Sequence, residues 1–265
     1  MGNDLLVSVI IPVFNVASYI VEALDSVAHQ TYGNLEIIIV DDGSTDGSGK
    51  ICDDYARKDK RFYVVHQANE GLSAARNTGL DLMNGEAVAF LDPDDAYHPD
   101  FIRAMVKALI NENADLVVCK YTKHNTSGIM KQARKSRPLP LIEAGVYDRK
   151  SILRSLVKRQ LNHAAWNKLY CKKLWNNFRY PVGVISEDTD TTYKILNYCN
   201  NVCVINLPLY FHRIRPGSIS FDYSKKALMI EFVLSLISIL LLKRIHPDYF
   251  LKSNREKAVK HYLIK

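Results

Sequence analysis

Three aspartates within four residues, Asp92, Asp94 and Asp95, form the strongest chemical signal in the sequence. They follow an apolar run at residues 87–91 that is typical of a buried strand. Like charges this close repel one another unless a cation or hydrogen-bond donors compensate them. Carboxylate oxygens suit Mg²⁺ or Mn²⁺, and Mg²⁺ usually takes one or two carboxylates together with substrate phosphates. The alternative is a turn that caps the following helix, with Asp95 or Asp100 as the N-cap.

Polar side chains also follow two earlier apolar runs. Asn15 comes after residues 6–13, and Asp41 and Asp42 come after residues 35–40. In sheets built from alternating strands and helices, ligands bind beyond the carboxyl ends of the strands. We therefore expect these side chains and the three later aspartates to face one binding site.

Two common nucleotide-binding motifs are absent from the sequence. The stretch from Gly43 to Lys50 superficially resembles a phosphate-binding loop, but Ile51 stands where that motif requires Ser or Thr. No G-x-G-x-x-G pattern follows the first apolar run, so a dinucleotide cofactor is not expected.

Apolar runs and amphipathic stretches alternate through the first 120 residues. The apolar runs predict strands at residues 6–13, 35–40, 62–65, 87–91 and 116–119. Helical periodicity predicts helices at residues 16–30, 46–57, 72–83 and 100–111. This alternation predicts an α/β fold with a mostly parallel sheet flanked by helices.

The second half of the sequence is less regular. Residues 121–150 are polar, basic and rich in turn-forming residues, which predicts an insertion or a mobile loop. Further elements are expected as helices at 149–159 and 187–198, a short segment at 166–170, and strands at 202–205 and 209–212. The last 40 residues are expected to be helical.

The composition and charge exclude some classes of protein. With 48% hydrophobic and 24% charged residues among 265, wholesale disorder is not expected. Residues 1–120 carry 19 acidic and 9 basic side chains, and residues 121–265 carry 9 acidic and 26 basic ones. The basic half could meet nucleic acid, anionic lipid or a phosphate-bearing substrate, or only aid solubility. Five cysteines without a C-x-x-C pair, and no signal peptide, favour a cytoplasmic protein.

Four sequence blocks together resemble the family 2 glycosyltransferases with the GT-A fold. They are VIIPVFN at 9–15, IVDDGSTD at 39–46, NEGLSAARN at 69–77 and FLDPDD at 90–95, in the order and spacing of that family. A looser resemblance continues through WNKLY at 166–170, the Glu187-Asp188 pair and YFHR at 210–213. It implies a nucleotide-sugar-binding GT-A core at 1–120, an acceptor-binding part of the same domain at 121–222 that carries the catalytic base, and a C-terminal helical basic region at 223–265.

The resemblance implies an inverting, metal-dependent enzyme of the bacterial polysaccharide or glycoprotein-glycan type. It would move glucose, galactose or an N-acetylhexosamine from a UDP-sugar to a hydroxyl of a glycan, glycoprotein or lipid-linked acceptor, with no nucleic acid as partner. Two alternatives stay open. A sugar nucleotidyltransferase would need a Gly-rich nucleotide loop, which residues 13–17 do not form. A non-catalytic UDP-sugar-binding partner subunit would not need the intact set of acidic residues.

The resemblance also assigns residues to the nucleoside. Pro12, Phe14 and Asn15 would line its pocket, where the ring of Phe14 could stack on the base. Core packing is the alternative for Phe14. Asp41 and Asp42 would accept hydrogen bonds from the base and the ribose.

The diphosphate and its metal would be held by residues further along the chain. By the resemblance, Arg76 would face the base or the diphosphate, since a guanidinium forks onto such oxygens. A surface ion pair is the alternative for Arg76. Asp94 would be the direct ligand of Mn²⁺ or Mg²⁺, and Asp92 would hold ribose or a metal-bound water. The metal would neutralise charge on the leaving group.

A catalytic base is expected at the start of a helix in the second half. Glycosyl transfer needs a carboxylate that activates the acceptor hydroxyl, and the family carries it in a Glu-Asp pair. Asp188 fits this role, with Glu187 or Asp190 in reserve. The alternative is that these acids only stabilise the helix N-terminus through its dipole.

The resemblance places a basic loop over the diphosphate. Arg213 and Arg215 follow a predicted strand and suit that role. His212 could complete the metal ligand set, but a lone histidine can also be held by hydrogen bonds alone. Many relatives carry an aromatic residue at this position, so His212 departs from the commoner pattern.

Two further features each allow two interpretations. Trp166 could pack in the core or form a platform beneath an acceptor sugar ring. The apolar block at residues 229–242 has two basic residues on either side. It could make peripheral contact with the inner face of a membrane, or pack as a core helix.

Overall fold

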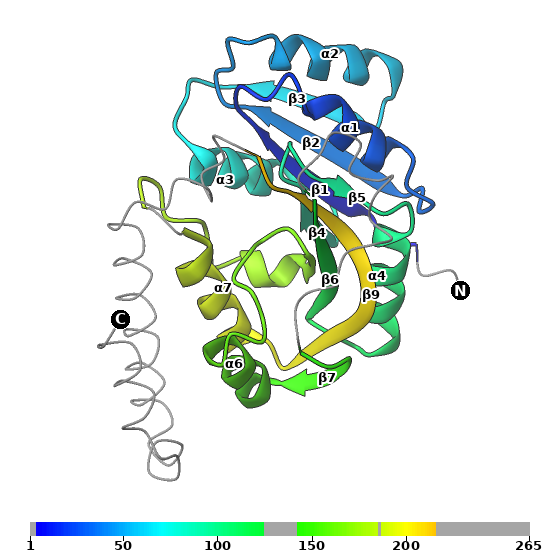
Figure 1. The fold of residues 1–265 in the computed structure, drawn as a ribbon, viewed down its shortest axis with the longest axis vertical. Helices are drawn as coiled ribbons and strands as arrows, with labels where there is room; N and C mark the ends of the chain where they lie inside the picture. Colours follow the sequence, from blue (N-terminus) through cyan, green and yellow to red (C-terminus); the bar gives the residue numbers. More distant parts are fainter. Residues whose placement is uncertain (1–3, 125–141, 185–186, 216–265) are drawn as a thin grey trace.

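A mixed sheet with helices on both faces runs through the part of the chain that the computed structural model describes, which is residues 4–124, 142–184 and 187–215 (Figure 1). The strands are β1 (Val7–Val13), β2 (Leu35–Asp41), β3 (Phe62–His66), β4 (Ala87–Phe90), β5 (Ala96–Tyr97), β6 (Leu116–His124), β7 (Gly145–Asp148), β8 (Lys168–Cys171) and β9 (Asn201–Arg213). The α-helices are α1 (Ile20–Ala28), α2 (Ser48–Lys58), α3 (Leu72–Leu82), α4 (Phe101–Asn111), α6 (Arg149–Val157) and α7 (Glu187–Tyr198), with a short 3-10 helix, η2 (Lys172–Trp175).

The strand order in the sheet is β3-β2-β1-β4-β8-β6-β9-β5, and β7 pairs with β9. The pairs β1–β2, β1–β4, β2–β3 and β6–β9 are parallel. The pairs β4–β8, β6–β8, β5–β9 and β7–β9 are antiparallel. The expected α/β sheet flanked by helices is therefore confirmed. Its parallel order is continuous from β3 to β4, and the antiparallel β8 then separates this half from the parallel pair β6–β9.

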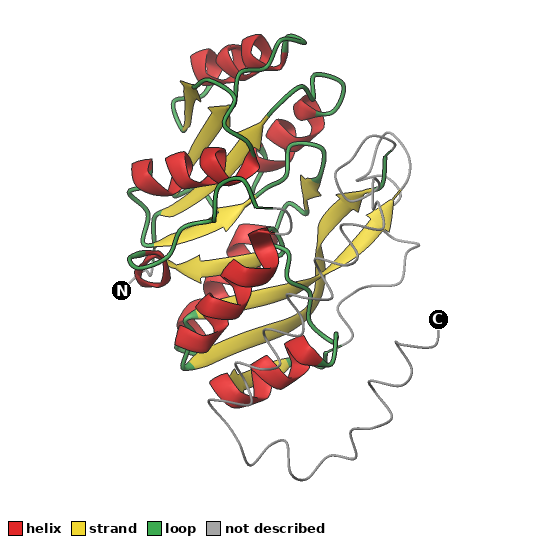
Figure 2. Ribbon diagram, turned by 90° about the vertical axis from the view of Figure 1, so that its left-hand side faces the viewer, coloured by secondary structure: helices red, strands yellow, loops and turns green. Residues whose placement is uncertain are grey.

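The apolar runs of the strands are buried on both faces of the sheet. In β1, Val9 and Ile11 face one core and Ile10 faces the other. Helices α1, α2 and α4 cover the first face, and α3, α6 and α7 cover the second (Figure 2). This two-sided burial explains why the strands have continuous apolar runs rather than alternating patterns.

The prediction of a loop at residues 121–150 is wrong at both ends. Strand β6 continues to His124, and β7 occupies Gly145–Asp148. The two strands predicted at 202–205 and 209–212 are one strand, β9, and its pairing with β6 shifts register on either side of Lys120, the residue opposite Pro208. A proline cannot donate to the ladder, so the sequence there looks like a break while the strand continues through an irregularity. Residues 125–141 lie outside the described part.

Helix α3 approaches β1 so closely that one position excludes any side chain. A Cβ on Gly79 would overlap Cγ2 of the fully buried Ile10 and stand 3.1 Å from its Cγ1. We expect Gly79→Ala to lower the free energy of unfolding by about 1–3 kcal/mol, because the core must shift to accept the methyl group. Urea unfolding measures this loss. Gly33→Ala is the control, since nothing lies within 4 Å of a Cβ there. Equal midpoints for the two variants would contradict the expectation.

Candidate active site

The polar residues after three strands meet at one edge of the sheet. Strands β2, β1 and β4 are neighbours and parallel, so their carboxyl ends lie side by side. Asn15 follows β1, Asp41 ends β2, and Asp92 follows β4. The expected gathering of these residues at one edge is therefore present in the structure.

The loop after β1 is open to solvent and tied to the loop after β2. Phe14 has 45% of its surface exposed, so the alternative that it packs in the core is wrong. Asn15 has a left-handed backbone with φ of 49°. Its Oδ1 accepts a hydrogen bond from the backbone N–H of Thr45 at 2.8 Å, and its own N–H donates to Ser44 Oγ at 3.1 Å. Pro12 is buried within β1.

The two aspartates at the end of β2 have different partners. Asp41 Oδ1 accepts from the N–H of Ser44 at 3.1 Å, and its Oδ2 lies 2.8 Å from Nδ1 of His66. The hydrogen bond to Asp41 raises the pKa of His66. Sequence reasoning missed His66, although it ends β3 and the rule of strand ends points to it.

Asp42 is buried and accepts hydrogen bonds from the loop before α3. Its carboxylate accepts from Gln67 Nε2 at 2.8 Å and from the backbone N–H groups of Glu70 at 3.0 Å and Gly71 at 2.8 Å. Its oxygens therefore fix the chain that leads to α3. The ribose contact expected for Asp42 stays a prediction.

Arg76 joins two distant parts of the chain in a buried ionic network. Its side chain extends from α3 and is 1% exposed. Nη1 donates to Glu187 Oε1 and to Asp188 Oδ1, both at 2.8 Å, and Nη2 donates to Asp92 Oδ1 at 3.1 Å. The carboxylate after β4 and the two at the start of α7 thus meet on one guanidinium. The resemblance directs Arg76 to a nucleotide, whereas the structure pairs it with three carboxylates. These ion pairs are buried, so the alternative of a surface ion pair is wrong in its location.

The network holds more negative than positive charge, and this shifts its pKa values. Burial opposes the charge on Arg76, but Asp188 and Asp92 raise the pKa of its guanidinium well above the ordinary value. Burial raises the pKa of Asp92 to about 7, even though Arg76 acts in the opposite direction. Burial and the neighbouring Asp188 also raise the pKa of Glu187. A further positive charge would stabilise this cluster.

The remaining aspartates after β4 are bound to β9 and the residues that follow it. Asp94 Oδ2 accepts from Nε of Arg215 at 2.6 Å, and its backbone carbonyl accepts from Nε of Arg213 at 2.7 Å. Asp95 accepts from the hydroxyl of Tyr210 at 2.6 Å and from the N–H of Arg213 at 2.7 Å. Burial raises the pKa of Asp95. Asp95 therefore anchors β9 to the loop at residues 91–95, the aspartate loop.

The capping alternative holds for the position of Asp100 only, and no capping hydrogen bond accompanies it. Asp100, not Asp95, occupies the N-cap of α4. Asp100 instead accepts from Thr31 Oγ1 at 2.7 Å. Asp92, Asp94 and Asp95 therefore do not cap α4.

His212 and Trp166 lie together behind the aspartate loop. Nδ1 of His212 is 3.2 Å from Asp95 Oδ2, and although burial opposes protonation, this contact raises the pKa of His212. The Trp166 indole is 7% exposed and stacks on the rings of Tyr210 and His212 with centroid separations of 4.3 and 5.2 Å. The structure favours packing, not an acceptor platform, for Trp166. Hydrogen bonding accounts for His212, and its ligation of a metal stays a prediction.

The basic loop expected to begin before Arg213 starts later, because Arg213 is the last residue of β9 and only Arg215 lies beyond the strand. The two arginines flank Tyr19, which sequence reasoning did not single out. The guanidinium carbons of Arg213 and Arg215 lie 5.2 and 5.0 Å from the centre of the Tyr19 ring. Nη2 of Arg213 donates to Glu22 Oε2 at 2.5 Å, and Arg213 is 4% exposed. Arg215 has 20% of its side chain exposed. Of the pair, Arg215 is the better placed to reach a bound ligand.

The carboxylates fit a cation that arrives with a phosphate ligand. Within the described ranges, no three His, Cys, Asp or Glu side chains form a ready metal site. Asp92 and Asp94 offer two carboxylates, each paired with one arginine, and the charges of Asp95 and Asp188 also act on Asp92. Mg²⁺ characteristically takes such a pair and completes its shell with phosphate oxygens and water.

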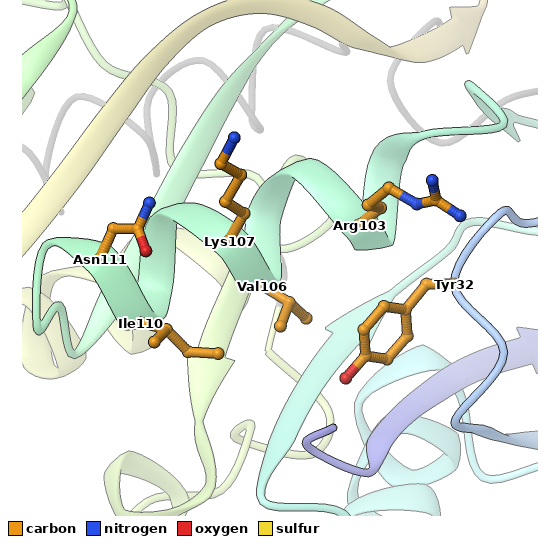
Figure 3. A pocket seen from close by; sticks show the side chains of 6 residues that line it. All are labelled: Tyr32, Arg103, Val106, Lys107, Ile110 and Asn111. Carbon is orange, nitrogen blue, oxygen red and sulfur yellow. The ribbon is translucent and has the colours of Figure 1, made fainter. Parts of the chain in front are cut away.

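A separate surface hollow lies along α4 and does not belong to this site (Figure 3). Its lining residues are Tyr32, Arg103, Val106, Lys107, Ile110 and Asn111. None of them contributes to the carboxylate network. We assign this hollow no role in the chemistry.

No helix among the described residues is both long enough and apolar enough to span a bilayer. The basic region predicted at 223–265, and the membrane contact proposed for it, lie outside these residues.

Comparison with known proteins decides the family of the chain. The family model described as glycosyl transferase family 2 matches residues 8–181. The chain belongs to this family. Glycosyltransferase GlyA of Streptococcus pneumoniae is 37% identical over 231 residues, which cover 83% of this chain and 32% of GlyA. The chain thus spans about a third of that relative.

Solved structures of glycosyltransferases share the fold of this family 2 chain. S. aureus TarS 1-349 in complex with UDP-GlcNAc has a TM-score of 0.70 at 24% identity, covering 82% of this chain and 61% of TarS 1-349. Mannosyltransferase PcManGT of Pyrobaculum calidifontis, in complex with GDP-Man and Mn²⁺, has a TM-score of 0.53 at 23% identity, covering 77% and 55% of the two chains. The GT-A fold expected from the sequence blocks is confirmed.

Proposed function

We propose that this family 2 chain is an inverting glycosyltransferase that moves a hexose from a UDP-sugar to a hydroxyl of a glycan, glycoprotein or lipid-linked acceptor. One observation carries the proposal. Arg76 brings the carboxylate of the expected metal motif, Asp92, and the expected base, Asp188, to opposite ends of one guanidinium. Leaving-group stabilisation and acceptor activation must act on two sides of one anomeric carbon, and the two contacts of Arg76 support a single site with one group for each.

The donor would lie across the carboxyl ends of β1, β2 and β4. Phe14 is exposed beside the loops that follow β1 and β2, where its ring can stack on a base. Asp41 is held by Ser44 and His66 in a fixed orientation, so it can accept from the base without reorganising. TarS, which shares the fold, binds UDP-GlcNAc. That complex supports a UDP-sugar as donor.

Asp92 and Asp94 would hold Mn²⁺ or Mg²⁺ together with the donor diphosphate. A bound divalent ion supplies positive charge for the phosphate oxygens as the leaving group departs. PcManGT, with the same fold, was solved with Mn²⁺ and GDP-Man. Arg215 pairs with Asp94 and would add a second positive group on the same side.

In the proposed transfer step, Asp188 takes the proton of the acceptor hydroxyl. The acceptor oxygen forms a bond to the anomeric carbon on the face opposite the diphosphate, and the bond from that carbon to the phosphate oxygen breaks. Its electron pair leaves with UDP. Arg76 keeps Asp188 oriented throughout through the 2.8 Å contact. A single displacement of this kind inverts the configuration of the sugar.

UDP release from a panel of UDP-sugars, with Mn²⁺, Mg²⁺ or excess chelator and no acceptor, tests the proposal. We expect slow, metal-dependent release from one donor. Asp94→Asn should lower that rate by about 10²-fold, because a ligand of the charge-stabilising ion is lost. Asp81→Asn is the control, since Asp81 is 63% exposed and pairs only with Arg179 in the described part of the chain.

Three outcomes would contradict parts of the proposal. UDP release that the chelator does not slow would show that the reaction needs no metal. Metal-dependent binding of UDP without turnover of any donor, in the presence of an acceptor library, would instead favour the non-catalytic partner subunit. Release from a GDP-sugar but from no UDP-sugar would replace the donor class.

A further inference from the structure

A fully buried lysine lies behind the proposed base and takes no part in the proposed transfer step. Lys168 begins β8, is 0% exposed and pairs in register with Val118 of β6. It belongs to the sequence block WNKLY at residues 166–170. Lysine is among the residues least often found fully buried, because its charge loses the solvation of water.

The ammonium group of Lys168 is solvated by neutral oxygens. The three N–H groups on Nζ are shared among four oxygens, which are the carbonyl of Ala164 at 2.5 Å, Oδ1 of Asn162 at 2.9 Å, Oδ1 of Asn167 at 3.0 Å and the carbonyl of Asn162 at 3.3 Å. Within the described part of the chain it makes no ion pair. Burial lowers the pKa of Lys168 to about 7, while the charge of Asp188 favours its protonated form. The ammonium therefore cross-links the segment 162–164 to β8.

The same segment packs against the helix that carries Asp188. Thr192 Oγ1 donates to the backbone carbonyl of His163 at 2.5 Å. Thr192 lies four residues after Asp188, so both project from one side of α7. Asp188 also acts electrostatically on His163, whose pKa burial lowers to about 4. Lys168, the segment 162–164 and the first turns of α7 thus form one contiguous support.

We propose that Lys168 is a positioning residue for Asp188, which it orients by holding residues 162–164 against α7. The inference rests on the proposed function, in which Asp188 is the base. According to this inference, Asp188 is supported from two different elements. Arg76 holds Asp188 from α3, and Lys168 supports it from β8 through the segment 162–164. In the described part of the chain, no hydrogen bond or ion pair joins Asn15, Asp41 or Asp42 to Lys168 or to this segment.

Lys168→Met tests this role, because methionine fills a similar volume without the charge or the donors. In acceptor-free UDP release, water takes the place of the acceptor and still needs the base. We expect kcat to fall by about 10–100-fold, since misplacement of a catalytic group by about 1 Å can cost 10²-fold. KM for the UDP-sugar should stay within about twofold. Lys173→Met is the matched control, since Lys173 is 64% exposed and pairs with Asp115 on the surface.

A double variant shows whether Lys168 acts through Asp188. Lys168→Met combined with Asp188→Asn should be no slower than Asp188→Asn alone, because a misplaced base and an absent base have the same consequence. Multiplied losses would overturn the inference, as would an unchanged kcat in Lys168→Met. If Asp188→Asn itself keeps full activity, the proposed base is wrong. If Asp188→Asn is slow and Lys168→Met is normal, only this inference fails.

Hydrogen–deuterium exchange of the full chain with UDP gives a readout that does not depend on turnover. Lys168→Met should raise the exchange of residues 162–164 and 187–192 and leave residues 41–48 unchanged. Uniformly raised exchange, or none, would overturn the inference. Should Lys168→Met fail to fold by circular dichroism, Lys168→Gln keeps two N–H donors and answers the same questions.

Discussion

Replacing Asp188 by asparagine should lower glycosyl transfer by about 10³-fold while the affinity for UDP stays within about threefold. Loss of a general base typically costs 10²–10⁴ in rate. Asparagine has the same shape as aspartate, and its carbonyl oxygen can still accept from Nη1 of Arg76, which is 2.8 Å from Asp188 Oδ1. The geometry therefore survives, and the ability to take a proton is lost.

Initial rates of UDP release with saturating donor and a glycoside acceptor measure the effect, and calorimetric titration with UDP and Mn²⁺ measures binding. Asp190→Asn, at the other reserve candidate for the base, is the comparison on the same helix. Its side chain is 36% exposed and pairs with Lys194 four residues later, so we expect less than a twofold change. If Asp188→Asn transfers normally and Glu187→Gln does not, Glu187 is the base. Activity in both variants would place the base outside this acidic pair.

The parts of the fold that sequence predicts well are those where local pattern and burial agree. Continuous apolar runs located β1, β2 and β4 because both faces of these strands are covered by helices. The acidic first turn and apolar periodicity placed α7 at residues 187–198, as the structure has it. Once these strands are known to be parallel, the rule of strand ends brings Asn15, Asp41 and Asp92 to one edge without further information.

The partners of buried charges could not be read in the same way. Arg76 meets Glu187 and Asp188 across 111 and 112 residues of sequence. Nothing local in the sequence distinguishes an arginine that faces a diphosphate from one that faces carboxylates, since both are anions. Lys168 is similar, because two of its four partners are backbone carbonyl oxygens, which any residue type can supply. The other two are side-chain oxygens of Asn162 and Asn167, which carry no charge that would mark them as partners.

Strand β7 was missed for a different reason. In β7, Gly145, Val146 and Asp148 are all exposed, so the segment lacks the apolar run that marks a buried strand. It forms only because β9 offers its edge there. Edge strands of this kind depend on tertiary pairing more than on their own pattern.

Replacing Arg76 by methionine should be the most destabilising single change in the site. Three carboxylates would lose their shared partner, and breaking a buried ionic group by removing one member costs about 3–5 kcal/mol. For a chain of this size that corresponds to a fall in melting temperature of roughly 6–20 °C. Arg76→Lys should recover part of the loss, because one ammonium restores the charge but cannot fork to both sides as a guanidinium does.

The pH dependence of this loss distinguishes an electrostatic cause from a packing defect. Without Arg76, the pKa values of Asp92 and Glu187, which burial already raises, should rise further above those of the unfolded chain. The unfolded state then binds fewer protons than the folded state, so the stability of the variant falls as pH increases. Thermal unfolding at pH 6 and pH 8 should therefore show the larger deficit at pH 8. Arg57→Met, at an arginine 68% exposed and paired only with Asp54 in the described structure, should change little at either pH. A deficit for Arg76→Met that is equal at both pH values would mean that lost packing, and not unpaired carboxylates, is the cause.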